Sequence, residues 1–348
     1  MKKLWTILLA AALGLGAFAA CGFETDTNDD LVWTRSSALC NECLERAPEP
    51  DSLAITIPEN DKSYSYAKAL GDLAEYYDFT VDISRGLNNW ILGMLSTLDE
   101  ILSYPPTDHD ADTCIWGPFI PNGLSPVEVR FSMTKISDTE FEYVWDQRLK
   151  NTDNAFQAVW GGMIQPSTDT ARRGIGNLFI DWTTAHDLDP TWDVTGRMDV
   201  EYDTYTDGRQ IDIVFTDFQN ERDLFPTNAT YHYHNRLDNS GEFLFEYAAD
   251  AYWDFLGGTP GQTELETITQ KTLWHGDGEG VSVFSMRDGD VTGRNLYGDF
   301  TMDEIEGYEC WNDVFERTYF RASVISTDGE KLTLDEEGVE TDCGGFAL

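Results

Sequence analysis

The chain has 348 residues and a formal charge of −40, because 63 Asp and Glu side chains stand against only 23 Lys and Arg. A surface with this charge repels phosphate backbones, which argues against nucleic acid as a partner. The 41% hydrophobic and 13% aromatic content supplies enough apolar material for a folded core, so the composition is not that of a disordered chain.

The first twenty residues have the layout of a secretory signal peptide. Lys2 and Lys3 form a positive start, an apolar run from Leu4 to Leu13 follows, and small residues lead to Cys21. The apolar run is too short to span a bilayer comfortably. Residues 18–22, Phe-Ala-Ala-Cys-Gly, resemble the lipobox of bacterial lipoproteins, and the resemblance is limited to this leader.

The resemblance implies that Cys21 is acylated and becomes the mature N-terminus of an exported, membrane-anchored protein. Phe18 stands where the family usually has Leu, so ordinary cleavage after Ala19, which leaves a soluble exported protein, is the alternative. Gly22, rather than Asp, follows the cysteine, and by analogy with enteric sorting rules this favours the outer membrane.

Residues 21–62 are expected to form an acidic tether followed by a cysteine-containing connector. Removal of the leader takes away two lysines and leaves 21 basic against 63 acidic residues, a charge of −42. Self-repulsion on this scale is screened at about 1 M salt, where the Debye length falls to roughly 3 Å. We therefore expect a halophilic protein from a marine or hypersaline source; the alternative is an ordinary acidic envelope protein that binds divalent cations diffusely.

Export to an oxidising compartment makes disulfides the expected state of the cysteines. Cys310 and Cys343 both lie near the C-terminus and are expected to pair, which leaves Cys114 to pair with Cys40 or Cys43. The CxxC motif formed by Cys40 and Cys43 has no βαβ setting for redox chemistry and no second ligand pair for structural zinc.

The segment 63–106 is predicted to be helical. Its apolar residues recur at helical spacing on one face, and Pro105 and Pro106 end the pattern. An earlier apolar set with the same period begins at Leu70, and residues 84–86 mark either a break between two helices or a weak point in one long helix. The main apolar face consists of Leu87, Trp90, Ile91, Met94, Leu95, Leu98, Ile101 and Leu102.

From Pro126 to about Leu334 the pattern changes to the period-two alternation of β-strands, broken by Gly-containing turn signals. Roughly ten to twelve short strands are expected, in an antiparallel meander that closes into a barrel or folds into two layers. We thus expect an α+β fold that is mainly β, with a β domain over 124–348 packed with the helical segment as one unit. The alternating runs are Val127, Val129, Phe131 and Met133; Phe141, Tyr143 and Trp145; Met198, Val200 and Tyr202; Ile211, Ile213 and Phe215; Phe243, Phe245 and Tyr247; and Val281, Val283 and Ser285.

His232 and His234 are the first candidates for a metal site. Residues two apart on a strand share a face, so both imidazoles could ligate an ion, with His275 or a carboxylate as third ligand. The alternative is that Tyr231 and Tyr233 face the core while the histidines lie on a solvated face.

Asp108, Asp110 and Asp112 alternate in a predicted loop and are the candidates for a calcium site. The glycine and the terminal Glu of an EF-hand loop are missing, and a solvated acidic loop is the alternative. The acidic loop that begins at His275 is read in the same way.

The sequence contains no catalytic motif, and no cofactor is predicted beyond a divalent cation. We expect an envelope protein held at the membrane by its N-terminal lipid, acting as a non-enzymatic binding or structural module for an apolar or glycan ligand. The alternative is a secreted hydrolase that uses carboxylates or a metal at His232 and His234.

Overall fold

The computed structural model describes residues 46–48, 50–58, 69–121, 125–167, 173–220, 226–249, 265–297, 300–343 and 346. This part of the chain is mainly β-structure, with sixteen antiparallel strands and two α-helices. It divides into two compact units. Unit 1 draws on Ile55–Gly86 and Thr227–Leu348, and unit 2 on Leu87–Pro226 and the described end of Ala10–Ala54.

Unit 2 contains a sheet in which each strand pairs with the next along the chain. The helix α4 (Trp182–Leu188) connects two of these strands, and the Asp181 carboxylate caps it by accepting a hydrogen bond from the amide of Thr184. The strands are β1 (Asp108–His109), β2 (Thr113–Phe119), β3 (Val127–Ser137), β4 (Glu140–Leu149), β5 (Gln157–Pro166), β6 (Gly174–Asp181), β7 (Val194–Asp203) and β8 (Arg209–Asn220).

Unit 1 contains a second meander, in which β13 stands aside and pairs only with β14 among the described residues. Its strands are β9 (Thr227–Asn235), β10 (Gly241–Ala249), β11 (Glu266–Trp274), β12 (Gly280–Asp288), β13 (Asn295–Tyr297), β14 (Phe300–Trp311), β15 (Arg317–Ser326) and β16 (Lys331–Gly338). The strand runs expected from residue 126 onward fall on strands of the two units, and the connections at residues 204–208, 236–240 and 275–279 lie where the Gly-containing signals predict them.

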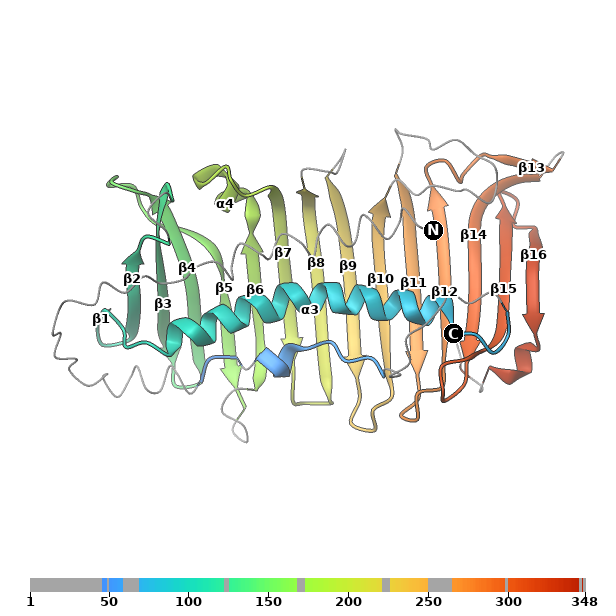
Figure 1. Cartoon of the computed structure of the whole chain (residues 1–348), viewed down its shortest axis with the longest axis horizontal. Coiled ribbons are helices and arrows are strands. Elements are labelled where there is room, and N and C mark those ends of the chain that lie inside the picture. The colour runs from blue at the N-terminus through green and yellow to red at the C-terminus, as the bar shows by residue number, and fades with distance from the viewer. Residues whose placement is uncertain are drawn as a thin grey trace. The chain divides into compact units, whose positions relative to one another are not determined.

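The expected closure of the meander into a barrel is not found. Among the described residues no pairing joins β1 to β8 in unit 2 or β9 to β16 in unit 1. Instead, the strands of each unit lie side by side and a helical segment runs across them (Figure 1). A helix therefore forms the second layer of each unit, because its apolar face buries the sheet face that closure would have buried.

That helix is α3 (Glu75–Leu102), a single element of 28 residues that continues through residues 84–86. The predicted helical segment starts too early: residues 63–68 lie outside the described chain, and residues 69–74 are not helical. Gly71 has a φ of +84°, and Leu73 forms an isolated antiparallel bridge with Glu316. Backbone pairing with the segment before β15 thus replaces the helical turn that the spacing of Leu70 and Leu73 suggested.

The apolar face predicted for the second part of α3 is confirmed, since all eight of its residues from Leu87 to Leu102 are buried. Trp90 meets Trp182 of α4 edge-on, with 5.1 Å between ring centroids, and Trp182 in turn stacks on Phe215 of β8. Aromatic contacts of this kind account for much of the core of unit 2.

In unit 1 the first part of α3 meets a sheet face that carries buried polar side chains. The amide nitrogen of Gln270 donates to the carbonyl oxygen of Tyr76 (2.7 Å) and to the hydroxyl of Thr80 (2.6 Å). The Thr80 hydroxyl also lies 2.7 Å from that of Thr272, which lies 2.9 Å from that of Ser282. Because these groups are buried, the helix must keep one position for their hydrogen bonds to be made.

Aromatic side chains in both sheets lie over glycines on the neighbouring strand. Trp311 covers Gly280 and Trp274 covers Gly241 in unit 1, while Tyr202 covers Gly176 in unit 2. A Cβ at any of these glycines would overlap the ring. The glycines are therefore required by close approach of a ring within an otherwise regular strand.

The predicted disulfide between Cys310 and Cys343 is present, with its Cα atoms 5.3 Å apart. Cys343 packs with Val281, Tyr308 and Tyr319 in a small core, so the bond fixes the C-terminal segment against the sheet of unit 1. Cys114 is also disulfide-bonded. Its predicted partners Cys40 and Cys43, the signal peptide and Cys21 lie outside the described residues.

Asp78, in the first turn of α3, is expected to make the stability of unit 1 depend on pH. Burial, and then the charge of Asp82, raise the pKa of Asp78 to about 6. A carboxyl with a raised pKa costs nothing while it is protonated in both states; the cost grows as the pH rises from the ordinary value of 3.8 and is complete above about 6. Asp78→Asn should therefore increase the free energy of unfolding at pH 8 by about 1 kcal/mol, after allowance for solvent screening.

The gain in the free energy of unfolding from Asp78→Asn should disappear toward pH 4. Urea unfolding of the wild type and the variant at pH 4 and pH 8 would measure it. An equal effect of Asp78→Asn at the two pH values would contradict this origin of the shift.

Candidate functional site

The open face of unit 2 has a shallow basin of about 350 Å³ over β5, β6, β7 and β8. Its floor consists of two rows of side chains that lie in register across these four strands. With strands about 4.8 Å apart, each row extends for about 14 Å. The first row is Met163, Asn177, Glu201 and Asp212, and the second is Gln165, Ile175, Asp203 and Gln210.

Strand alternation explains why these side chains gather on one face. Their neighbours in sequence, such as Leu178, Val200 and Ile211, are buried in the core of unit 2. The rows therefore project to the other side of the sheet, where Met163 is 36% and Ile175 43% exposed. An exposed apolar pair surrounded by carboxylates and amides is thus built into regular strands.

Hydrogen bonds hold several polar groups of the basin in place. The Asn177 side-chain oxygen accepts from the amide of Met163 (3.1 Å), and the Gln210 amide donates to Asp212 (3.2 Å). Burial raises the pKa of Asp203, but hydrogen bonds from Thr206 and from the amides of Tyr205 and Thr206 outweigh it and lower that pKa below its usual value. The Asp203 carboxylate is therefore charged and fixed near neutral pH.

None of the described residues that line the basin is basic, and four of them are carboxylates: Glu140, Glu201, Asp203 and Asp212. Arg197, on the same strand as Glu201, donates three hydrogen bonds to Asp199 outside the basin. The basin consequently favours ligands that are neutral or positively charged.

His232 and His234 lie on one face of β9, opposite the buried Tyr231 and Tyr233. His234 Nδ1 lies 4.0 Å from the Glu242 carboxylate on β10, which also accepts a hydrogen bond from Arg236. Within the described residues the one group of three converging ligands does not include this pair. Metal binding by His232 and His234 stays a prediction.

The three predicted calcium ligands lie at the β1–β2 turn and are exposed. Asp110 accepts hydrogen bonds from the amides of Asp112 (2.9 Å) and Thr113 (2.8 Å), and these bonds lower its pKa. Asp108 accepts from the amide of His109. These contacts give Asp108 and Asp110 roles in the turn itself, and calcium binding by them and Asp112 stays a prediction.

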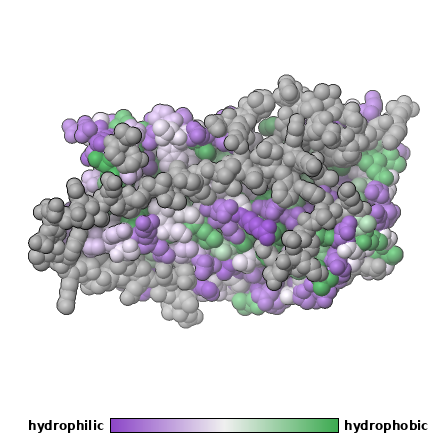
Figure 2. Space-filling view, in the orientation of Figure 1, coloured by the Kyte–Doolittle hydropathy of each residue, from purple (hydrophilic) through white to green (hydrophobic). Residues whose placement is uncertain are grey.

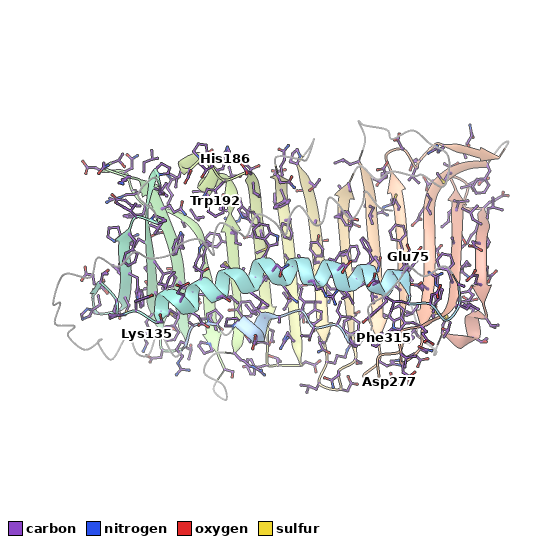
Figure 3. The ribbon with its side chains drawn as sticks, viewed as in Figure 1. Glu75, Lys135, His186, Trp192, Asp277 and Phe315 are labelled. Atoms are coloured by element: carbon purple, nitrogen blue, oxygen red, sulfur yellow. A yellow bond between two sulfur atoms is a disulfide. The ribbon has the colours of Figure 1, made fainter. Side chains whose placement is uncertain are left out.

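The structure groups His275 with Asp277 and Glu279, in the turn between β11 and β12, with all three donor atoms within 4.8 Å of one another. Figure 3 labels Asp277 in this turn. His186, also labelled there, has a different role: its Nδ1 donates to the carbonyl oxygen of Trp192 (2.7 Å), which ties the end of α4 to the following loop.

The most buried carboxylate groups serve the fold. Glu309 is 0% exposed and accepts hydrogen bonds from the amides of Glu75 (2.9 Å) and Tyr76 (2.6 Å). Glu266 is equally buried and accepts from the amide of Asp290 (2.8 Å). Neither carboxylate is accessible to a substrate.

Comparison of the chain with protein-family models, with curated proteins and with solved structures finds no match. Within the described residues, neither helix combines the length and apolar character needed to cross a membrane.

Sequence reasoning did not find the basin, although every residue in it follows the strand alternation. The polar side chains occupy the outward positions of the alternating strands. They form two rows only when the register of the four strands is known. The sequence places His275, Asp277 and Glu279 in one loop, and the turn geometry brings their donor atoms together.

Proposed function

We propose that the protein is an exported envelope lipoprotein, anchored through Cys21, whose unit 2 binds a glycan in the basin on its open face. The observation that carries this proposal is the double row of carboxylates and amides around Met163 and Ile175. The charge of −42 on the mature protein suits a marine or hypersaline setting, in which salt screens the repulsion between its acidic side chains.

The chemistry of the basin matches that of a sugar surface. Carboxylate and amide side chains hydrogen-bond hydroxyl groups, and apolar side chains pack against the C–H faces of the ring. A basin about 14 Å long has room for two or three sugar units. The four carboxylates select against acidic glycans and favour neutral or amino sugars.

The glycan ligand has more support than the apolar one. The core-facing side chains of unit 2, such as Leu178, Val200 and Ile211, are buried and offer no accessible surface to an apolar ligand. Figure 2 shows the face that carries α3, on which hydrophilic and hydrophobic side chains are intermixed. The basin is open and edged by charge, which suits a hydroxylated ligand better than a lipid chain.

Calorimetric titration with three soluble probes tests the ligand class: a neutral maltohexaose, a cationic chitosan hexamer and an anionic hexagalacturonate. We expect saturable binding of the neutral or the cationic probe and none of the anionic one. Glu201→Gln, which removes a charge at the centre of the first row without changing shape, should weaken that binding about tenfold, as expected for loss of a charged hydrogen bond.

The matched control is Asp199→Asn, two residues away on the same face of β7 and outside the basin. It should leave the affinity unchanged. Failure of the neutral and the cationic probes to bind, or equal affinities in wild type and Glu201→Gln, would contradict a glycan site here.

The lipid anchor is tested by labelling the full chain with radioactive palmitate during expression in a Gram-negative bacterium. Wild type should be labelled and sediment with membranes, whereas Cys21→Ser should be unlabelled and appear in the soluble fraction, because the acylated thiol is lost. Cys40→Ser serves as control and should behave as wild type. Label that persists in Cys21→Ser would overturn the anchor.

A further inference from the structure

The turn between β11 and β12 brings an imidazole and two carboxylates together at the surface of unit 1. It consists of residues 275–279 and is closed by hydrogen bonds from the amide of His275 to the carbonyl of Glu279 (2.8 Å) and from the amide of Gly278 to the carbonyl of His275 (3.0 Å). His275 and Asp277 are exposed and Glu279 is partly exposed. The Asp277 carboxylate also accepts a hydrogen bond from the amide of Glu279 (3.3 Å), so the three side chains extend from a short segment that is closed by hydrogen bonds.

The imidazole is oriented from outside the turn. The His275 ring stacks on Phe346, with 4.1 Å between centroids and 22° between planes. Phe346 packs against the small core around Cys310 and Cys343, so the disulfide holds the stacking partner in place. Stacking fixes the plane of the ring, and its Nδ1 lies 4.0 Å from the Glu279 carboxylate.

The two carboxylates gain no basic partner in this arrangement. Among the described residues, neither Asp277 nor Glu279 forms an ion pair with a Lys or Arg; within the turn, the nearest basic group is the His275 imidazole, 4.0 Å from Glu279. Two carboxylates and an imidazole thus converge on a point that a cation would stabilise. The nitrogen donor distinguishes this group from the many exposed acid clusters of an acidic chain.

We propose that His275, Asp277 and Glu279 bind one divalent transition-metal ion, with Zn²⁺ as the favoured ion. Imidazole with carboxylate is a donor set that Zn²⁺ accepts, whereas Ca²⁺ and Mg²⁺ prefer oxygen ligands alone. Ligands about 2.1 Å from a tetrahedral ion stand about 3.4 Å apart. The donors lie within 4.8 Å of one another, so small rotations of exposed side chains complete the site.

Three protein ligands leave the fourth position of the ion open to water or to a donor from another molecule. The site lies in unit 1 and uses no residue of the glycan basin, so it does not depend on the function proposed for unit 2.

The test is titration of the full chain, stripped with a chelator, with Co²⁺ followed by visible absorption and with Zn²⁺ followed by calorimetry. One ion should bind per chain, with a visible Co²⁺ band that Zn²⁺ removes and Ca²⁺ does not. His275→Ala should abolish the band and weaken Zn²⁺ binding at least tenfold. Thermal melts of the apo proteins, which should agree, show that the variant is folded.

Two controls separate this site from the other histidines. His109→Ala, at the end of β1 beside the acidic turn, and the double variant His232→Ala/His234→Ala should both bind Zn²⁺ as wild type does. The proposal is overturned if wild type shows no saturable Co²⁺ or Zn²⁺ binding, if binding survives His275→Ala, or if it is lost only in the His232/His234 variant.

Discussion

The carboxylate of Glu309 on β14 accepts hydrogen bonds from the backbone amides of Glu75 and Tyr76, the first two residues of α3. The packing of unit 1 depends on this contact. The first amides of any helix lack partners within it, so a buried helix start needs an acceptor from elsewhere. Arg317 on β15 donates to the same carboxylate (2.7 Å) and lies 3.8 Å from Glu75. Burial raises the pKa of Glu309, and Arg317 with the two amides counteracts that effect. One side chain thereby joins the helix to two strands.

The rest of the helix–sheet contact in unit 1 follows from that fixed start. Thr80, one turn further along α3, meets Thr272 and Gln270 only if the helix begins where Glu309 places it. Trp311, at the end of the same strand, covers Gly280 and contacts Tyr77. The side of the sheet that faces the helix therefore fits α3 in shape and polarity. The turns and the open faces of the sheets are left to bind ligands.

Local patterns predicted what depends on neighbours in sequence. The apolar face of α3 from Leu87 onward, the alternating strands and the Cys310–Cys343 bond were all accessible in this way. Backbone pairing between segments far apart in the sequence could not be predicted from such patterns. Leu73 kept a helical spacing but pairs with Glu316, more than two hundred residues away, and β2 was missed because its alternation around Trp116 ends at Gly117-Pro118. The basin is invisible for the same reason, since it exists only through strand register.

The role of Glu309 is tested most directly by comparing Glu309→Gln with Glu306→Gln on the same strand in urea unfolding. Glu306 is partly exposed and pairs with Lys331, so its loss should cost about 1 kcal/mol or less. Glu309→Gln leaves the buried Arg317 without its closest charge partner and should cost about 3 kcal/mol or more. Equal and small losses in the two variants would contradict the claim that Glu309 sets the position of the helix.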